Sequence, residues 1–223
     1  MRNPDIARPK GTLIKRIVAL ATSTLANALD NIGLHDNVIV GIKAVAPGFR
    51  FVGPAVTVKE RSGKYGSFAS ADFKVGEMID AAKAGDVIVV DASGAPYSTW
   101  GGMASCAAKL KGIAGLVVDG SVRDLEEITE FEFPVFARHL VPTTGRTRLK
   151  VEAINMPVEI DGVAVAPGDI IVADGTGIVC LPADRADEIV RIAEGFARDD
   201  AAAEDDLKAG LTFSQAMAKY KRI

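Results

Sequence analysis

The chain has 223 residues and a formal net charge of −3 at pH 7, and this length is enough for one sizeable hydrophobic core. No stripe of Lys and Arg marks a nucleic-acid surface, and no apolar stretch is long enough to span a membrane. Because no signal-peptide pattern is visible, we expect a cytoplasmic protein with neither nucleic acid nor a membrane as its partner.

The first third of the sequence predicts two helices and two short strands. A helical period covers residues 13–20, and Ser and Thr precede a second helix that stops at Gly33. Residues 42–45 and 55–58 are typical of strands, because Pro-Gly and Gly-Pro pairs interrupt the apolar pattern. The polar, glycine-containing segment 61–66 predicts a mobile loop that could border a site.

The middle of the chain predicts a strand–helix–strand unit, preceded by a helix over residues 75–83. Residues 87–90 and 114–118 are continuously apolar, as buried parallel strands are, and a small-residue helix over 103–110 joins them. In such units ligands collect beyond the carboxyl ends of the strands, where the helices begin.

Two short motifs follow these strands. Trp100-Gly-Gly-Met-Ala-Ser-Cys106 places two glycines at the start of the helix, where free backbone N–H groups can face a ligand. Val118-Asp-Gly-Ser-Val-Arg-Asp124 ends in a planar guanidinium, which suits an oxyacid, and a carboxylate, which suits a hard cation. We therefore expect Arg123, Asp124 and the glycine pair at one edge of the sheet.

Structural roles are open for the same residues. Asp124 and Glu127 match a helix N-cap with an acid three residues later, so Asp124 could simply cap a helix that runs through Ile128. Asp119-Gly120 could form a plain turn, and the glycine pair could serve close packing alone.

The last part of the sequence predicts four strands and a helical tail. Asp161-Gly162 is a strong two-residue hairpin signal. The expected strands cover residues 158–160, 163–165, 170–173 and 178–181. After Pro182 the chain becomes acidic and helical through Leu207. We expect a single domain with a helical extension (residues 1–35), an α/β core (36–182) and a helical tail (183–223).

Two cysteines and two histidines restrict the chemistry. Cys106 and Cys180 have no CxxC spacing and are expected to be reduced, buried thiols. A zinc site would consume nearly all of these residues, so we expect any metal to be Mg²⁺ or Mn²⁺, held by few carboxylates, water and substrate. A nucleophilic pair of Cys180 with His139 is conceivable, although nothing nearby in the sequence orients it.

Residues 85–182 resemble the RraA-like family, which includes the 4-hydroxy-4-methyl-2-oxoglutarate and 4-carboxy-4-hydroxy-2-oxoadipate aldolases. The matching pieces stand in order: Gly85-Asp-Val-Ile-Val-Val-Asp91, Gly101-Gly102 with Ala107-Ala-Lys109, Gly112-Ile-Ala-Gly115, Asp119-Gly-Ser-Val-Arg-Asp124, Pro134-Val-Phe-Ala-Arg138 and Pro167-Gly-Asp169. The resemblance implies a swivelling β/β/α fold with mixed sheets, assembled as a homotrimer or homohexamer.

The resemblance also implies roles for individual residues. Backbone amides would bind a pyruvate-like carboxylate at four consecutive positions, Gly101, Gly102, Met103 and Ala104. Arg123 would bind keto or carboxylate oxygens, and Asp124 would be the metal ligand. Glu204 in the acidic tail is the best match for a glutamate that supports the metal waters of a neighbouring subunit, so the site would span two chains.

These roles fit one chemistry. Breaking a C–C bond beside a 2-keto acid leaves enolate charge, which a chelated divalent ion and Arg123 would stabilise. We expect a metal-dependent lyase that cleaves a 4-hydroxy-2-keto diacid to pyruvate or decarboxylates oxaloacetate. A Schiff base on Lys59, Lys64, Lys83 or Lys109 is the alternative mechanism. The alternative function is a non-catalytic regulator that binds a ribonuclease or another protein, as some members of the family do.

Overall fold

The structure is a computed structural model that describes residues 5–220. The helices are α1 (Gly11–Val18), α2 (Thr22–Asn31), the 3-10 turn η1 (Ser70–Phe73), α3 (Val75–Ala81), α4 (Gly102–Lys111), α5 (Leu125–Glu130), α6 (Ala186–Lys208) and α7 (Phe213–Lys219). The strands are β1 (Val38–Ile39), β2 (Lys43–Ala44), β3 (Phe51–Ser62), β4 (Val87–Asp91), β5 (Ser98–Trp100), β6 (Gly115–Val122), β7 (Val135–Leu140), β8 (Leu149–Ile154), β9 (Val158–Ile160), β10 (Val163–Val165), β11 (Ile170–Ala173) and β12 (Ile178–Leu181).

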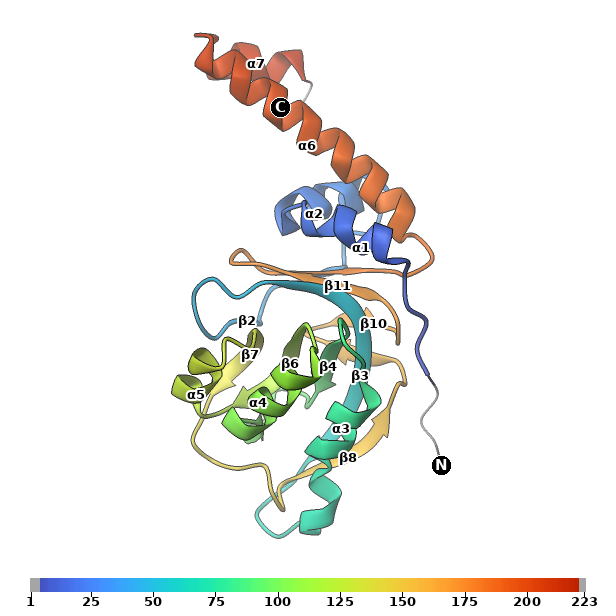
Figure 1. Cartoon of the computed structure of the whole chain (residues 1–223), viewed down its shortest axis with the longest axis vertical. Coiled ribbons are helices and arrows are strands. Elements are labelled where there is room, and N and C mark those ends of the chain that lie inside the picture. Colours follow the sequence, from blue (N-terminus) through green and yellow to red (C-terminus); the bar gives the residue numbers. More distant parts are fainter. Residues whose placement is uncertain (1–4, 221–223) are drawn as a thin grey trace.

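Strand β3 joins the two halves of a mixed sheet, whose order is β1-β12-β11-β3-β4-β6-β7-β2. Its residues 51–54 pair antiparallel with β11, whereas residues 55–59 pair parallel with β4. From Val58 to Ser62, β3 also pairs antiparallel with β8, with a bulge between Lys59 and Glu60. Figure 1 shows β3 as a long bent strand through the middle of the molecule. The expected single-domain α/β fold with mixed pairing is therefore present.

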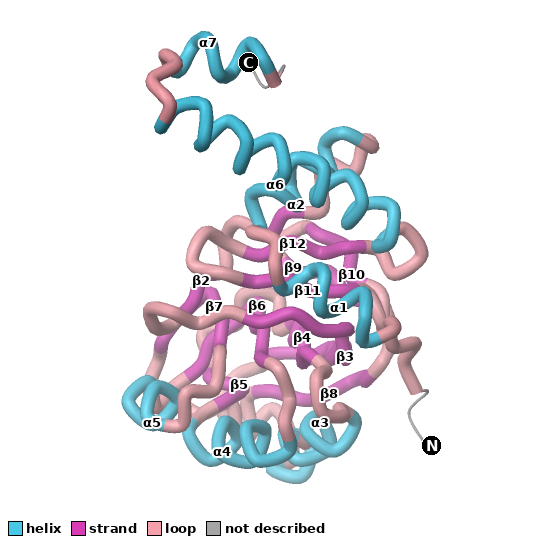
Figure 2. The backbone as a smooth tube through the Cα atoms, turned by 45° about the horizontal axis from the view of Figure 1, so that its top comes forward, coloured by secondary structure: helices cyan, strands magenta, loops and turns pink. Residues whose placement is uncertain are grey.

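Strands β4 and β6 are parallel neighbours and buried along their whole length, as their continuous apolar runs predict. Helices α3, α4 and α5 share one core cluster with these strands, in which Met78, Ala108 and Ile128 pack against Ile88 and Val118. Figure 2 shows the three helices gathered at one end of the molecule. The helix starts that follow β5 and β6 consequently lie beside each other.

An ion-pair network connects the β9–β10 hairpin to strands β6 and β7 of the sheet. Arg138 on β7 contacts Asp119 on β6 at 2.7 Å and Asp161 in the hairpin turn at 2.6 Å. These carboxylates raise the pKa of Arg138, and the guanidinium lowers the pKa of Asp161. Asp161 and Gly162 both have positive φ, the conformation that a two-residue hairpin of this type requires.

Helices α1, α2 and α6 pack on β11 and β12 and form a third core cluster. The second half of α6 extends away from the body, and α7 follows it (Figure 1). Asp206 on α6 accepts bonds from Lys219 and Tyr220, at 2.7 and 2.8 Å. In residues 5–220, no helix combines the length and the apolar character needed to cross a membrane.

Two local expectations are wrong. Residues 61 and 62 belong to β3 rather than to a mobile loop, because β8 continues the pairing on this side. Asp119 and Gly120 lie inside β6 rather than in a turn, because the strand continues to Val122 and pairs with β7. In both cases the sequence is too polar to be recognised as a strand, and pairing with a neighbouring strand stabilises the strand conformation.

Glu60 is a buried carboxyl group in β3, with 1% of its surface exposed. Its Oε1 accepts a hydrogen bond from the Thr99 hydroxyl at 2.7 Å, and its Oε2 has no hydrogen-bond partner among the residues that the structure describes. Burial raises the pKa of Glu60 to about 7, although the bond from Thr99 lowers it. The folded protein therefore keeps a proton on this group at a pH where an exposed Glu is ionised.

We expect Glu60→Gln to change how stability depends on pH. A raised folded-state pKa gives full stability below the ordinary pKa of 4.5 and progressively less as the pH rises to about 7. The neutral Gln should remove this loss, which is on the order of 3 kcal/mol for a shift of this size. The free energy of unfolding of both proteins in urea, measured from pH 5 to pH 8, tests this expectation. The same pH dependence in Glu60→Gln would contradict the assignment.

Candidate active site

The two sequence motifs meet at one edge of the sheet. The Arg123 N–H, just beyond β6, donates to the carbonyl of Trp100 at the end of β5, at 3.0 Å. A cavity of about 340 Å³ opens beside this bond. It is lined by Phe73, Val75, Ile79, Ser98, Thr99, Trp100, Gly101, Met103, Ala104, Ala107, Arg123, Asp124 and Thr144. Five of the six residues expected at the site within one chain line this cavity, and the sixth, Gly102, is buried behind it.

The first turn of α4 presents backbone donors at this place. Ser105 is the first residue whose N–H reaches back along the helix, to the Gly101 carbonyl at 3.0 Å. The N–H groups of Met103 and Ala104 precede this first intrahelical donor, so they have no acceptor within the helix and are available to a ligand. Because the helix dipole adds partial positive charge here, the position favours an anion.

Asp124 turns its carboxylate toward α4 instead of its own helix. It occupies the N-cap position of α5 in a left-handed conformation, with φ of 59°, and makes no side-chain capping bond. Its Oδ2 instead accepts a hydrogen bond from the Gly102 N–H at 3.2 Å. The capping hypothesis thus explains where Asp124 stands and not where its carboxylate points. A left-handed non-glycine residue costs about 1 kcal/mol or more, and such residues cluster at functional sites.

Arg123 lies against the same carboxylate. Its Nε is 3.4 Å from Asp124 Oδ2, and 45% of the Arg123 side chain and 34% of the Asp124 side chain are exposed. Both groups are therefore accessible to a ligand while they constrain each other. Exposed pairs of this kind contribute little to stability, so the ion pair by itself does not account for the position of these side chains.

The glycine pair makes room for these side chains. A Cβ at Gly101 would lie 2.5 Å from Asp124 Oδ2 and 3.2 Å from Arg123 Cγ. A Cβ at Gly102 would overlap the carboxylate of Glu127, which packs on this residue from α5. The packing alternative for the two glycines is thus correct: Gly101 makes room for Arg123 and Asp124 of the candidate site, and Gly102 makes room for Glu127 of α5.

A hard divalent ion fits the oxygen donor at this site. Asp124 offers an accessible carboxylate, and Mg²⁺ binds through one or two carboxylates while it keeps water and substrate oxygens as further ligands. Within residues 5–220, no group of three or more His, Cys, Asp and Glu is placed to hold a metal by itself. The accessible carboxylate therefore suits an open Mg²⁺ or Mn²⁺ site, and the identity of the metal stays a prediction.

Glu204 is not near this cavity in the single chain. It lies exposed on α6, where its carboxylate contacts Lys208 at 2.7 Å. Figure 1 shows the end of α6 projecting on the side of the molecule opposite to α4 and α5. Its role toward a neighbouring subunit stays a prediction.

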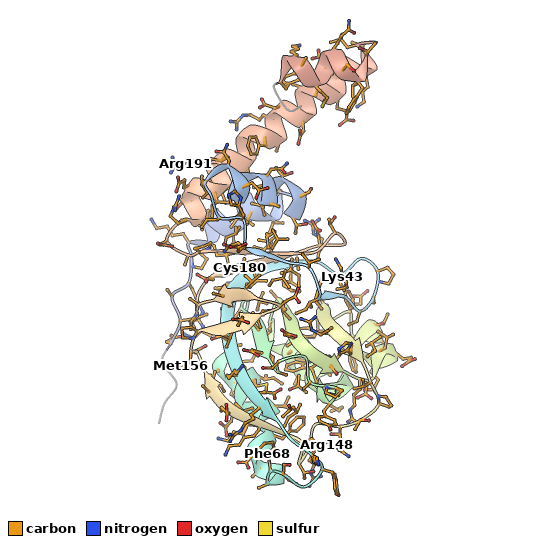
Figure 3. The ribbon with its side chains drawn as sticks, turned by 180° about the vertical axis from the view of Figure 1, so that it is seen from behind. Lys43, Phe68, Arg148, Met156, Cys180 and Arg191 are labelled. Carbon is orange, nitrogen blue, oxygen red and sulfur yellow. The ribbon has the colours of Figure 1, made fainter. Side chains whose placement is uncertain are left out.

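The alternative nucleophiles lie elsewhere. Cys180 is buried in β12 (Figure 3), whereas His139 is on β7, with β11, β3, β4 and β6 between their strands. Of the four candidate lysines, all in the described part of the chain, none lines the cavity, and Lys59 contacts Asp91 at 2.7 Å. Cys106 is partly exposed on α4, so the expectation that it is buried is wrong.

The sequence motifs do not reveal the apolar wall of the cavity. Val75 and Ile79 come from α3, which shares a core cluster with α4, whereas Phe73 comes from η1 and packs in another cluster. Thr144 forms an isolated β-bridge with Ser98 of β5. The Phe68 N–H donates to the Thr147 carbonyl at 3.2 Å, and Figure 3 shows Phe68 and Arg148 together at this end of the molecule.

Comparison with known proteins agrees with the fold and the motifs. The sequence pattern of the RraA-like family, described as Aldolase/RraA, matches residues 22–180. A relative from Halalkalibacterium halodurans, provisionally named 4-hydroxy-4-methyl-2-oxoglutarate aldolase, is 32% identical over 86% of this chain and 86% of its own length. Protein DlpA of Legionella pneumophila is 30% identical over 93% of this chain, which spans only 34% of DlpA.

A solved structure shows the same architecture. Streptomyces coelicolor RraAS2, described as an unusual member of the RNase ES inhibitor RraA protein family, superposes with a TM-score of 0.80 at 29% identity. The match covers 89% of this chain and 98% of that structure. The family pattern, the relatives and the fold agree, and the chain belongs to the RraA-like family.

Proposed function

We propose that the protein is a divalent-metal-dependent lyase that acts on small 2-keto acids. It would release pyruvate by aldol cleavage of a 4-hydroxy-2-keto acid, or decarboxylate oxaloacetate. The observation that carries this proposal is the convergence of free helix N–H groups, Arg123 and Asp124 on one cavity. The aldolase name of the Halalkalibacterium halodurans relative supports it.

Each group has a distinct task in this proposal. The N–H groups of Met103 and Ala104 bind the substrate carboxylate, and the guanidinium of Arg123 binds the keto oxygen as it becomes an enolate oxygen. Asp124 would hold a Mg²⁺ or Mn²⁺ ion beside these groups. When bound, such an ion supplies a Lewis acid that stabilises negative charge on the enolate. Gly101 keeps Arg123 and Asp124 close to the helix start.

A regulator that binds a ribonuclease is the second candidate function, because RraAS2 is described as belonging to an RNase inhibitor family. The two candidates differ in what they require of the cavity. A regulator would act through its outer surface, whereas a lyase depends on Arg123 and Asp124. Assays of 4-hydroxy-2-keto acids and oxaloacetate, with Mg²⁺ or with EDTA, therefore separate them.

Replacing Asp124 by Asn should remove the activity and keep the fold. The amide oxygen of Asn can still accept the bond from Gly102, and Asn also tolerates the left-handed conformation. As a neutral amide is a poor ligand for a hard cation, we expect Mg²⁺-dependent pyruvate release to fall by about 100-fold. Asp187→Asn on exposed α6 is the matched control and should keep full activity. A fully active Asp124→Asn protein would leave Asp124 with a structural role only.

We also propose that the active unit is a homotrimer or homohexamer in which a neighbour's acidic tail, with Glu204, completes the site. The half-exposed Arg123 and Asp124, and the extension of α6 away from its own body, support this arrangement. Truncation after Arg198 keeps the buried residues Ile189, Val190 and Ala193 that anchor α6 to the body.

The truncated chain should fold and be inactive. Mixed with Asp124→Asn chains, it should regain part of the activity, because some interfaces then pair an intact Asp124 with an intact tail. Pyruvate release from oligomers shown to contain both chains is the measurement. Inactive mixed oligomers, or an active truncated monomer, would contradict a shared site.

A further inference from the structure

The cavity has two ends of different chemistry. Arg123, Asp124 and the first turn of α4 form the polar end. The other end is a groove between α3 and α4 whose walls are apolar. Its apolar residues, here called the apolar groove, are Phe73, Val75, Ile79, Ala104 and Ala107. Ser98, Thr99, Trp100, Gly101, Met103 and Thr144 complete the lining of the cavity.

The apolar groove offers no partner for a second negative charge. Among the described residues that line the cavity, Arg123 is the only cationic side chain, and the polar end uses it. Cations on the neighbouring segments contact other groups: Lys74 contacts Glu77 at 3.2 Å, and Lys111 donates to the Ile79 carbonyl at 2.7 Å. Arg146 donates to the Ser70 hydroxyl at 3.0 Å, and Arg148 donates to the Thr144 carbonyl at 3.0 Å. A carboxylate in this groove would lose water without gaining a counter-charge.

The groove also leaves apolar surface uncovered. Met103 is 77% exposed although it stands in the first turn of a helix whose buried side packs on the core. Ala107 is exposed one turn further along α4, and Val75 faces the same cavity from α3. An apolar group of the substrate would cover these side chains and would be favoured by their burial.

We infer that the substrate carries one carboxylate, bound at the polar end, and an apolar chain that lies in the apolar groove. The inference rests on the proposed 2-keto-acid function and specifies its substrate class. It replaces the diacid substrates, oxaloacetate among them, with a 2-keto monoacid that has an aliphatic or aromatic substituent. Ala107 is then a specificity-determining position, because its side chain borders the groove one turn beyond the start of α4, where the polar end lies.

Binding of two matched acids tests this inference without requiring turnover. 2-Oxohexanoate and 2-oxoadipate share the 2-keto acid end and a linear chain, and the second ends in a carboxylate. Calorimetric titration in the presence of Mg²⁺ should show 2-oxohexanoate binding the wild-type protein at least about ten-fold more tightly. Ala107→Arg should reverse or abolish this preference, because its guanidinium would lie in the groove. Leu110→Arg, which adds the same charge to the same helix at an exposed position outside the cavity, should leave the preference unchanged.

The possible results separate this inference from the function on which it rests. Equal or tighter binding of 2-oxoadipate by the wild type would overturn the apolar groove as a substrate site, while pyruvate release from 4-hydroxy-2-keto acids would leave the lyase function standing. An equal effect of Ala107→Arg and Leu110→Arg would likewise overturn it, since only net charge would then matter. If neither acid binds, both the inference and the 2-keto-acid function are wrong.

Discussion

The hydrogen bond from the Arg123 N–H to the Trp100 carbonyl joins the two segments on which the candidate site depends. One segment leads from β5 into α4, and the other leads from β6 into α5. Because β5 and β6 run parallel, both segments end at the same edge of the sheet. This single register brings a helix start, a guanidinium and a carboxylate together, although Gly102 and Asp124 stand 22 positions apart in the sequence.

This edge of the sheet contains conformationally unfavourable features, which the rest of the fold stabilises. Asp124 is left-handed, its carboxylate faces Arg123 and the start of α4, and two glycines replace side chains that would otherwise fill the space. The buried strands β4 and β6 and the aromatic stack of Trp100 on Phe133 fix the position of these residues. On another side of the sheet, the Arg138 network fixes the β9–β10 hairpin to β6 and β7. Such rigid support is what a preorganised anion and cation site requires.

The sequence predicts well the elements whose signals are local. Continuous apolar runs identify β4 and the first half of β6, and Asp161-Gly162 marks the hairpin because its backbone conformation needs those residue types. The glycine pair and Arg123-Asp124 could also be placed at one edge, since parallel strands order their ends. The course of β3 through Lys59, Glu60 and Arg61 could not be foreseen, because that polar stretch is a strand through its pairing with β8. The direction of the Asp124 carboxylate and the apolar wall from α3 depend on packing between distant segments, which no local pattern encodes.

The central claim is that Asp124, Arg123 and the α4 amides form one site for a metal-chelated oxyacid. Calorimetric titration with oxalate, which resembles the enolate of pyruvate, tests it most directly when wild type and Gly101→Ala are compared with and without Mg²⁺. Ala tolerates the extended backbone of Gly101, but its Cβ would displace Asp124 Oδ2. We predict Mg²⁺-dependent oxalate binding by the wild type and a loss of about ten-fold or more in a folded Gly101→Ala protein. An oxalate affinity that changes neither on removal of Mg²⁺ nor on substitution of Gly101 would contradict the claim.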